Sequence, residues 1–302
     1  MMKLYGCALL PKHKDILLWH YTSAEVFWKM LGGEFYATHY RFLNDSTEIT
    51  YGVYEIEQFL HNDTSLKGLQ FAVDDLKRKD IFLLCFSKDP DNLYQWRSYT
   101  PNGGFSIGFS YNKLVQLLNE SSFDPEKLLL FNLVGCQYLP QNSIAEFMYK
   151  LTSEFKTSVS QLSNTEKSLF KKSLLRIEKG DFSKEIGDLH QKSPKLFSLL
   201  VDMYKLSFLL QAECPAFKNP SFKFEKEYRL VVTGENLRKR INLIGGKPRI
   251  KIPIENIQQC IKQLYISPHG DVEQNKLLAE IAKERFGLDF QIHTSKSSYN
   301  GK

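Results

Sequence analysis

The stretch LLWHYTSAEVFWKMLGG, residues 17–33, changes from a strand pattern to a helix pattern within a few positions. Apolar and aromatic residues dominate 15–22, which predicts a β-strand. Ser23 follows directly and can cap the N-terminus of a helix, and Gly32-Gly33 can end that helix. The sequence therefore predicts a strand, a tight junction and a short helix.

Three residues with polar groups, His20, Tyr21 and Thr22, lie at this junction. A histidine at the end of a strand is often packed in the core with its hydrogen bonds satisfied. The same residue can instead face a ligand, because the ends of strands commonly carry binding groups. Both interpretations are open at this point.

The pattern beyond the junction predicts an α+β protein. Residues 46–63 and part of 66–80 are expected to be helical, as is the final helix at 272–287. Residues 142–212 are rich in Lys, Ser, Leu and Phe and are expected to form a helical insertion. The remaining apolar runs predict a mixed or antiparallel sheet with strands at 15–22, 34–45, 80–89, 105–110, 128–139, 222–234, 248–254, 261–268 and 288–294.

Composition is that of a globular protein with a real core. The chain has 302 residues, 42% of them hydrophobic and 25% charged, with a net charge of +6. Length alone allows one large domain or two ordinary ones. We expect a single α+β domain over 1–302, with 142–212 inserted in it.

Several classes of protein are disfavoured by what the sequence lacks. The five cysteines are scattered and form no CxxC pair, so neither a disulfide framework nor a zinc site is expected, and no metal is predicted. No window reaches the roughly 20 apolar residues of a membrane span, and no signal pattern is seen at the N-terminus. The expected location is the cytoplasm, with no membrane partner. Phosphate-loop, HExxH, GxGxxG and GxSxG motifs are absent.

Two stretches carry local positive charge, 167–180 and 238–251. A run of this kind is most often a solvated face. It can also contact nucleic acid or another anionic partner. The GGK at 245–247 lacks the spacing of a phosphate loop and is expected to be a turn.

Two further segments carry polar groups near strands. CFSKDPDNLYQWRSY, residues 85–99, brings Ser87 out of an apolar strand and toward Trp96. In FEKEYR, residues 224–229, an extended strand would place Glu225 and Glu227 on one face. Two carboxylates so placed repel each other, and such a pair is either a solvated surface feature or part of a site.

Taken together, these segments resemble the DUF2971 family of bacterial proteins. The family's run is an HYT, an ND…E turn, a CFS…D…W…Y segment and a late E-[KE]-E-[YW]-R. Arg97-Ser98 departs from the family, where Ser-His is more usual. The matching elements here are His20-Tyr21-Thr22, Asn44-Asp45 with Glu48, Cys85-Phe86-Ser87 with Trp96 and Tyr99, and Glu225 to Arg229.

That family is in turn similar to a distant branch of the ADP-ribosyltransferase fold, in which a split sheet binds NAD. His20 and Thr22 match the triplet that ends the first core strand of that fold, with Tyr21 where glycine is usual. Glu227 matches the catalytic glutamate on a late strand. The resemblance implies that NAD is consumed as a substrate, so a Rossmann phosphate loop is not required.

The resemblance assigns roles that suit the chemistry. Cleavage of the bond between nicotinamide and ribose passes through an oxocarbenium-like state, which a carboxylate stabilises. Glu227 is expected to do this, while Glu225 orients or deprotonates the acceptor. Other side chains are expected to contact NAD: His20 and Thr22 at the ribose, Arg41 at the pyrophosphate, and Tyr21 and Ser87 nearby. Tyr36, Tyr40 and Trp96 are candidates for the aromatic contact with the cationic ring, and Tyr40 is the first choice because it lies near the end of the second strand.

The leading hypothesis is thus an NAD-dependent ADP-ribosyltransferase-like enzyme, acting as a toxin or anti-phage effector. Its acceptor would be a protein or a nucleic acid, and an antitoxin or regulatory partner would fit such a role. The first alternative is a binding module without catalysis, in which Glu225 and Glu227 form surface salt bridges. The second is a nuclease or phosphotransferase on the same scaffold.

Overall fold

The computed structural model describes residues 15–45, 47, 49–121, 129–178, 187, 189–191 and 193–297. Its contacts divide the chain into two compact units. Unit 1 consists of residues 1–48, 80–138 and 220–302, and unit 2 consists of residues 49–79 and 139–219.

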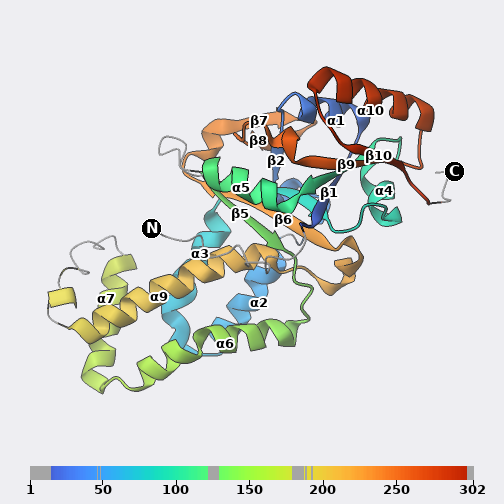
Figure 1. Ribbon diagram of the computed structural model, residues 1–302. Helices are drawn as coiled ribbons and strands as arrows, with labels where there is room; N and C mark the ends of the chain where they lie inside the picture. Colours follow the sequence, from blue (N-terminus) through green and yellow to red (C-terminus); the bar gives the residue numbers. More distant parts are fainter. Residues whose placement is uncertain are drawn as a thin grey trace. The chain divides into compact units, whose positions relative to one another are not determined.

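Unit 1 contains a large and mainly antiparallel sheet (Figure 1). Among the described strands, only β9 and β10 pair in parallel. The order along the main path is β10-β9-β4-β1-β3-β2-β8-β7, and β6 pairs with both β3 and β5. The strands are β1 (Leu17–Thr22), β2 (Tyr36–His39), β3 (Phe82–Ser87), β4 (Phe105–Ser110), β5 (Leu129–Gly135), β6 (Glu227–Gly234), β7 (Ile241–Ile244), β8 (Lys247–Lys251), β9 (Ile261–Ile266) and β10 (Gln291–Thr294).

The sheet forks at β3. Along one edge, β3 pairs with β6 over its whole length, from Phe82 to Ser87. Its other edge is shared by two strands: β2 pairs with it at Phe82 and Leu83, and β1 pairs with it at Ser87. The middle of that edge therefore has no neighbouring strand. The mixed or antiparallel α+β class is confirmed, and the fork is the feature that positions the site.

The two faces of the sheet differ in chemistry. Because side chains alternate along a strand, Leu18, Phe86 and Leu230 point to one face, where they join the main apolar core. Trp19 and Glu227 point to the other face. There Trp19 packs with Tyr21 and Trp96 in a small separate cluster. Ser87 and Arg229 share the face of Glu227, whereas His20 lies on the face of Leu18, with its ring against Phe86.

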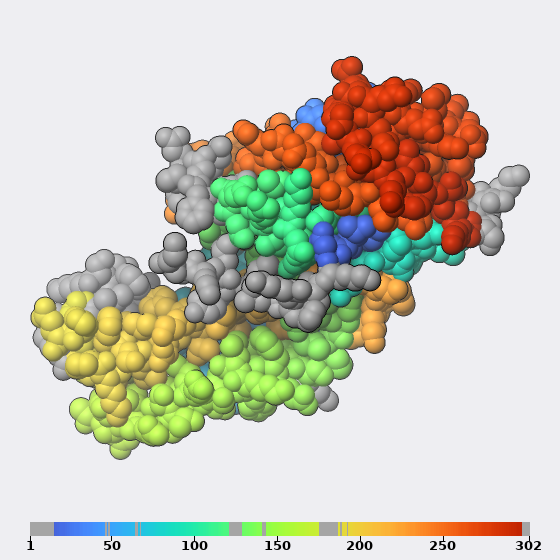
Figure 2. Space-filling view, viewed as in Figure 1, coloured from blue at the N-terminus to red at the C-terminus, as the bar shows by residue number. Residues whose placement is uncertain are grey.

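Three helices, α1, α5 and α10, contribute residues to the main apolar core of unit 1, whereas Trp96 of α4 belongs to the small cluster on the other face. Ser23 caps α1 as expected, with its hydroxyl accepting from the Val26 amide at 3.3 Å. Along α10, Ala279 and Ala282 are buried, while Leu277 is exposed. The helix itself, red in the colouring by sequence, lies at the surface of unit 1 (Figures 1 and 2). The helices of unit 1 are α1 (Ala24–Leu31), α4 (Leu93–Tyr99), α5 (Tyr111–Ser121) and α10 (Val272–Phe286), with 3-10 turns η1 (Tyr40–Phe42), η4 (Pro220–Glu225), η5 (Leu237–Arg240) and η6 (Ile257–Cys260).

Unit 2 is helical. Within it α9 packs against α3 and α6, and α2 packs against α6. The helices expected in 46–63 and 66–80 thus pack with the helical stretch at 142–212, and the single-domain boundary 1–302 stays a prediction. The elements are α2 (Thr50–His61), α3 (Gln70–Arg78), α6 (Gln141–Ser160), α7 (Asn164–Glu178) and α9 (Pro194–Glu213), with η2 (Thr64–Leu69) and η3 (Cys214–Ala216).

The structure refines one expectation about strands, corrects a second and adds a strand. The stretch 34–45, expected to be a strand that runs into a polar turn, forms β2 and then turns into η1 at Tyr40. The strand predicted at 222–234 begins at Glu227, because residues 220–225 form a 3-10 turn. The run at 241–244 is a strand that the sequence did not predict. It pairs with β8 through the Gly245-Gly246 turn, and both glycines have positive φ.

Among the described residues, no helix is both long and apolar enough to cross a membrane. The same part of the chain contains no cluster of three or more His, Cys, Asp or Glu side chains arranged to hold a metal ion.

Candidate active site

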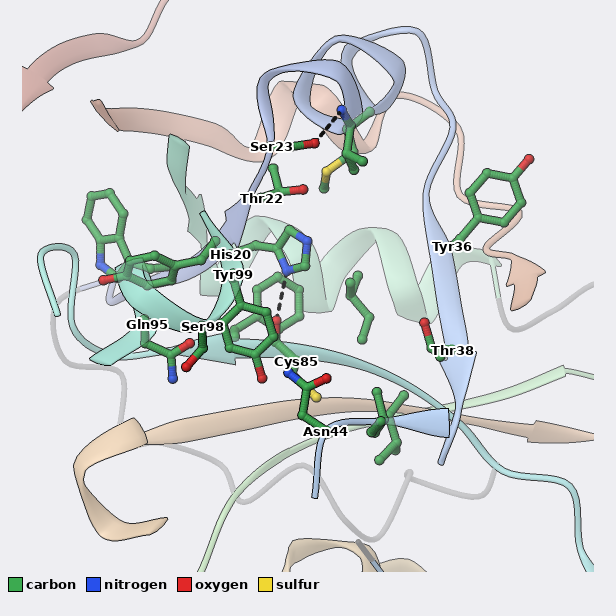
Figure 3. A pocket seen from close by; sticks show the side chains of 18 of the residues that line it. His20, Thr22, Ser23, Tyr36, Thr38, Asn44, Cys85, Gln95, Ser98 and Tyr99 are labelled. Atoms are coloured by element: carbon green, nitrogen blue, oxygen red, sulfur yellow. Dashed lines mark hydrogen bonds between the residues drawn. The ribbon is translucent and has the colours of Figure 1, made fainter. Parts of the chain in front are cut away.

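A cavity of about 380 Å³ lies in unit 1 beside the fork in the sheet (Figure 3). This volume is in the range of small-molecule sites. Leu84 and Phe86 reach it from one face of β3, and Leu83 and Cys85 reach it from the other. Side chains from both faces of one strand can share a cavity only where a neighbouring strand is missing. The cavity therefore follows from the divergence of β1 and β2.

His20 projects from β1 into this cavity (Figure 3). Its Nδ1 lies 2.9 Å from the main-chain oxygen of Cys85. A carbonyl oxygen only accepts hydrogen bonds, so Nδ1 carries the proton and Nε2 keeps a lone pair. Burial lowers the pKa of His20, and the nearby charge of Arg249 lowers it further. The ring is therefore neutral at pH 7, with Nε2 ready to accept a hydrogen bond.

Tyr21 lines the cavity but is held firmly by its hydroxyl group. That hydroxyl donates to the Asp89 carbonyl at 2.6 Å and accepts from the Asn92 amide at 2.9 Å. Its ring packs edge-on against Trp96, with centroids 4.7 Å apart. Burial raises the pKa of Tyr21. Tyr21 thus fixes the loop after β3 to the end of β1 and remains a neutral hydroxyl.

Thr22 ends β1 at the cavity, where β4 approaches very closely. A Cβ atom at Gly104 would lie 2.2 Å from the Thr22 carbonyl oxygen, and Gly104 has φ +143°. Only glycine allows this approach. Gly104 therefore positions the end of the triplet that carries His20.

Glu225 and Glu227 both line the cavity, although not as two positions of one strand. Glu225 ends η4, Glu227 begins β6, and Lys226 between them has φ +47°. This left-handed conformation is uncommon for a residue with a side chain. Hydrogen bonds hold the bend, since Ser87 Oγ donates to the Glu225 carbonyl at 2.7 Å and the Lys88 amide donates to the Lys226 carbonyl at 3.0 Å. The prediction that one extended strand carries both glutamates is therefore wrong, because the chain bends at Lys226, although both residues line the cavity.

Glu227 forms a buried ion pair with Arg229. Arg229 Nε donates to Glu227 Oε1 at 2.9 Å, and the Arg229 side chain is fully buried. The alternative that the glutamates make exposed salt bridges does not describe Glu227, of which 6% is exposed. The pair keeps a charged carboxylate at the cavity wall without leaving its charge uncompensated.

Helix α4 presents a polar face to the cavity. Gln95, Ser98 and Tyr99 line it, and their spacing places them on one side of the helix. Asn92 caps the helix, with its side-chain oxygen accepting from the Tyr94 amide at 2.9 Å. Tyr99 lines the same cavity as His20 (Figure 3), which makes it an aromatic candidate that the sequence prediction did not assign.

Strand β8 adds two cations that sequence reasoning also missed. Lys247 and Arg249 line the cavity, and Arg249 is opposite Thr38 of β2. The next residue, Ile250, points to the core face and is 1% exposed. The alternation in KPRIK indicates that the basic residues share one face of the strand, but nothing in the sequence showed that this strand pairs with β2.

The other predicted contacts do not line the cavity. Arg41 Nε donates to the hydroxyl of Tyr40 at 2.9 Å, and Tyr40 is buried. Trp96 is fully buried and donates to Asp91 at 2.7 Å, while Ser87 supports Glu225 from behind. The structure thus brings together His20, Tyr21, Thr22, Tyr36, Glu225 and Glu227, and it does not bring Tyr40, Arg41, Ser87 or Trp96 to the cavity wall.

The comparison with protein families bears on the same region. The profile of the family described as "Protein of unknown function (DUF2971)" matches residues 95–230. The resemblance to DUF2971 is confirmed. The DUF2971 match spans α4 and the start of β6, so Gln95, Tyr99, Glu225 and Glu227 fall within it, whereas His20 lies before it. No curated protein and no solved structure matches the chain.

Proposed function

We propose that the cavity binds NAD and that the protein transfers ADP-ribose from it to an acceptor. One observation carries this proposal: His20 and Glu227, far apart in the sequence, line a single cavity. The forked sheet that brings them together is the kind of architecture implied by the resemblance to ADP-ribosyltransferases. The acceptor would be a protein or a nucleic acid, consistent with a toxin or anti-phage effector.

The reaction is a substitution at C1′ of the ribose attached to nicotinamide. The bond between C1′ and the ring nitrogen breaks, and nicotinamide leaves with the bonding electron pair. A nucleophilic atom of the acceptor forms the new bond to C1′ and loses its proton. Positive charge develops on the ribose in between, so a carboxylate beside the sugar lowers the barrier.

Each role falls to a side chain at the cavity wall. Glu227 stabilises the developing charge through the ribose 2′-hydroxyl, and its pairing with Arg229 holds it in place. His20 Nε2 accepts a hydrogen bond from a ribose hydroxyl, because its other nitrogen is committed to Cys85. Glu225 takes the proton from the acceptor.

Tyr99, together with the predicted candidate Tyr36, takes the place of Tyr40 and Trp96 as an aromatic contact for the nicotinamide ring. Tyr99 is 41% exposed and lines the same cavity as His20 (Figure 3). A cationic ring near an aromatic face gains about 1–2 kcal/mol when desolvated. A buried side chain such as Trp96 offers no free face for this contact.

A second function has an observation in its favour. Because Glu227 already pairs with Arg229 in a buried position, the carboxylate can be explained as a structural group. The cavity would then bind a ligand without cleaving it. This is a modified form of the binding-module hypothesis, with a buried ion pair at Glu227 in place of the expected surface salt bridge, and it predicts NAD binding without nicotinamide release.

The test is release of nicotinamide from labelled NAD, with and without cell lysate or nucleic acid as acceptor. Glu227→Gln should lower the rate about 100-fold or more, and His20→Ala should lower it by a smaller factor. The exposed Glu235→Gln is the matched control and should be unaffected. Binding without release would support the binding module. Absence of both, or phosphate products without nicotinamide, would contradict the proposal.

A further inference from the structure

The positive charge at the cavity is concentrated on β8. Lys247 and Arg249 both line the wall, two residues apart on the face opposite the core. No salt bridge joins either of them to a carboxylate within the described residues. Two neighbouring cations without a counter-charge repel each other, and such an arrangement is suited to an anion.

Arg249 has a further feature that points to a ligand. Its Nε is buried and, among the described residues, has no hydrogen-bond partner. A buried donor without an acceptor is unfavourable. Thr38, its neighbour in the register of β2, also lines the cavity. A ligand oxygen placed there would satisfy the guanidinium and contact both strands.

The cavity is therefore bipolar. The register of the sheet gives the distance between the two groups. Arg249 of β8 pairs with Thr38 of β2, and Thr38 pairs with Leu83 of β3. Leu83 in turn pairs with Val231 of β6. Three strand spacings of about 4.8 Å separate β8 from β6, or about 14 Å across the sheet. Glu227 lies at the start of β6. The carboxylates of Glu225 and Glu227 thus lie across the cavity from the two cations, and a third carboxylate, Glu34, lines the wall just before β2.

We propose that Arg249 and Lys247 bind the diphosphate of the ligand, and that its cationic ring lies toward Glu227. This assignment rests on the proposed function for the identity of the ligand, because NAD carries a positive nicotinamide ring and a negative diphosphate. The guanidinium of Arg249 forms two parallel hydrogen bonds to phosphate oxygens, and the Lys247 ammonium acts as a point charge. The β7–β8 hairpin then sets the direction in which the dinucleotide lies.

The test measures binding of three probes by calorimetry: inorganic pyrophosphate, ADP-ribose and nicotinamide. Arg249→Gln should weaken pyrophosphate and ADP-ribose binding about tenfold or more and leave nicotinamide binding unchanged. Arg249→Lys should show an intermediate loss, because it keeps the charge without the fork. Lys251→Gln is the control, since Lys251 is on the same face of the same strand but outside the cavity.

Two results would overturn the assignment. One is ADP-ribose binding by Arg249→Gln at the affinity of the original protein. The other is a loss of pyrophosphate and ADP-ribose affinity in Lys251→Gln that equals the loss in Arg249→Gln, together with an equal loss of affinity for a ten-nucleotide single strand in both variants. That result would make β8 part of a nucleic-acid surface. Circular dichroism of each variant confirms that it is folded, and Arg249→Lys supplies the comparison if Arg249→Gln is not.

The same measurements distinguish failure of the proposed function from failure of the diphosphate site. If pyrophosphate binding depends on Arg249 while no nicotinamide is released under any condition, the diphosphate site stands and the transferase proposal fails. If nicotinamide is released and the rate and ADP-ribose affinity are insensitive to Arg249, the transferase proposal stands and the diphosphate site fails.

Discussion

Glu227 and Arg229 form an ion pair on one face of β6, with Nε and Oε1 2.9 Å apart and 6% or less of either side chain exposed. A buried pair of this kind is not strong evidence for stability as a whole, because desolvation offsets much of the attraction. Breaking it is costly, since the remaining charge is left buried. Glu227 therefore affects both stability and the proposed chemistry. The two roles are separated by comparing a substitution that removes the ion pair with one that keeps the hydrogen bond to Arg229.

Arg229→Met is expected to destabilise the protein by about 3–5 kcal/mol, because it leaves the Glu227 carboxylate buried without its partner. Glu227→Gln should cost less, about 1–3 kcal/mol, because the amide oxygen can still accept from Arg229 Nε. Denaturant unfolding measures both values. The exposed Arg285→Met serves as control and should change stability by about 0.5 kcal/mol or less. Equal, small effects of all three substitutions would show that the pair is not formed.

Stability should fall as the pH is lowered below 6.5, in part because of His20. Burial holds the pKa of His20 below its usual value of 6.5 in the folded protein. Between the lowered pKa and 6.5 the unfolded chain binds more protons, so the free energy of unfolding rises with pH in that window. The contribution is complete above pH 6.5 and is lost on acidification.

His20→Asn should flatten this dependence between pH 5 and 7 without abolishing it, because the pKa of His39 is also lowered by burial. Thermal unfolding at several pH values is the measurement. The amide of asparagine can still donate to the Cys85 carbonyl, so the variant keeps this hydrogen bond and loses only the titrating group. The quantity to compare is therefore the slope of the unfolding free energy against pH. An unchanged slope in His20→Asn would mean that His20 titrates normally.

Lys226 between the two glutamates should tolerate glycine better than alanine. Its φ of +47° is unfavourable for any residue with a Cβ. Both substitutions remove the half-exposed ion pair with Asp89, so only the backbone conformation differs between them. Lys226→Gly should be about 1 kcal/mol more stable than Lys226→Ala by denaturant unfolding. The reverse order would show that the left-handed bend is absent.

Gly104→Ala should destabilise the fold by about 2 kcal/mol or more, because the new Cβ would meet the Thr22 carbonyl at the end of β1. Gly287→Ala is the control: Gly287 ends α10 and does not line the cavity, and it also has positive φ, but no atom lies within 4 Å of the position that a Cβ would occupy there. It should cost only about 1–2 kcal/mol. The two variants are compared by denaturant unfolding and by ligand affinity, which only Gly104→Ala should lower. Equal losses in both measurements would contradict the positioning role of Gly104.

Local features of the fold were readable from the sequence. The cap at Ser23 and the turn at Gly245-Gly246 were predicted because each depends on residues next to each other in the chain. The junction at His20 was predicted as a strand end for the same reason. These are short-range effects of capping and turn chemistry, and they do not depend on the rest of the fold.

The features that were missed depend on contacts between distant segments. The left-handed Lys226 is held by hydrogen bonds from β3, so the pattern of alternating residues in 222–234 gave no sign of it. Arg249 reaches the cavity only because β8 pairs with β2. Trp96 is of a residue type that often stacks on ligand rings, but here it packs against Tyr21 and is buried. In each case tertiary pairing decided which side chain reaches the site.

The sharpest test of a shared NAD site is a crystal structure of Glu227→Gln with NAD, because this variant should bind NAD without cleaving it. We expect a ribose hydroxyl within about 3.2 Å of His20 Nε2, with the nicotinamide ring beside Tyr99 and the diphosphate against Arg249. NAD bound away from His20, or a cavity that stays unoccupied at saturating NAD, would show that His20 and Glu227 do not serve one dinucleotide.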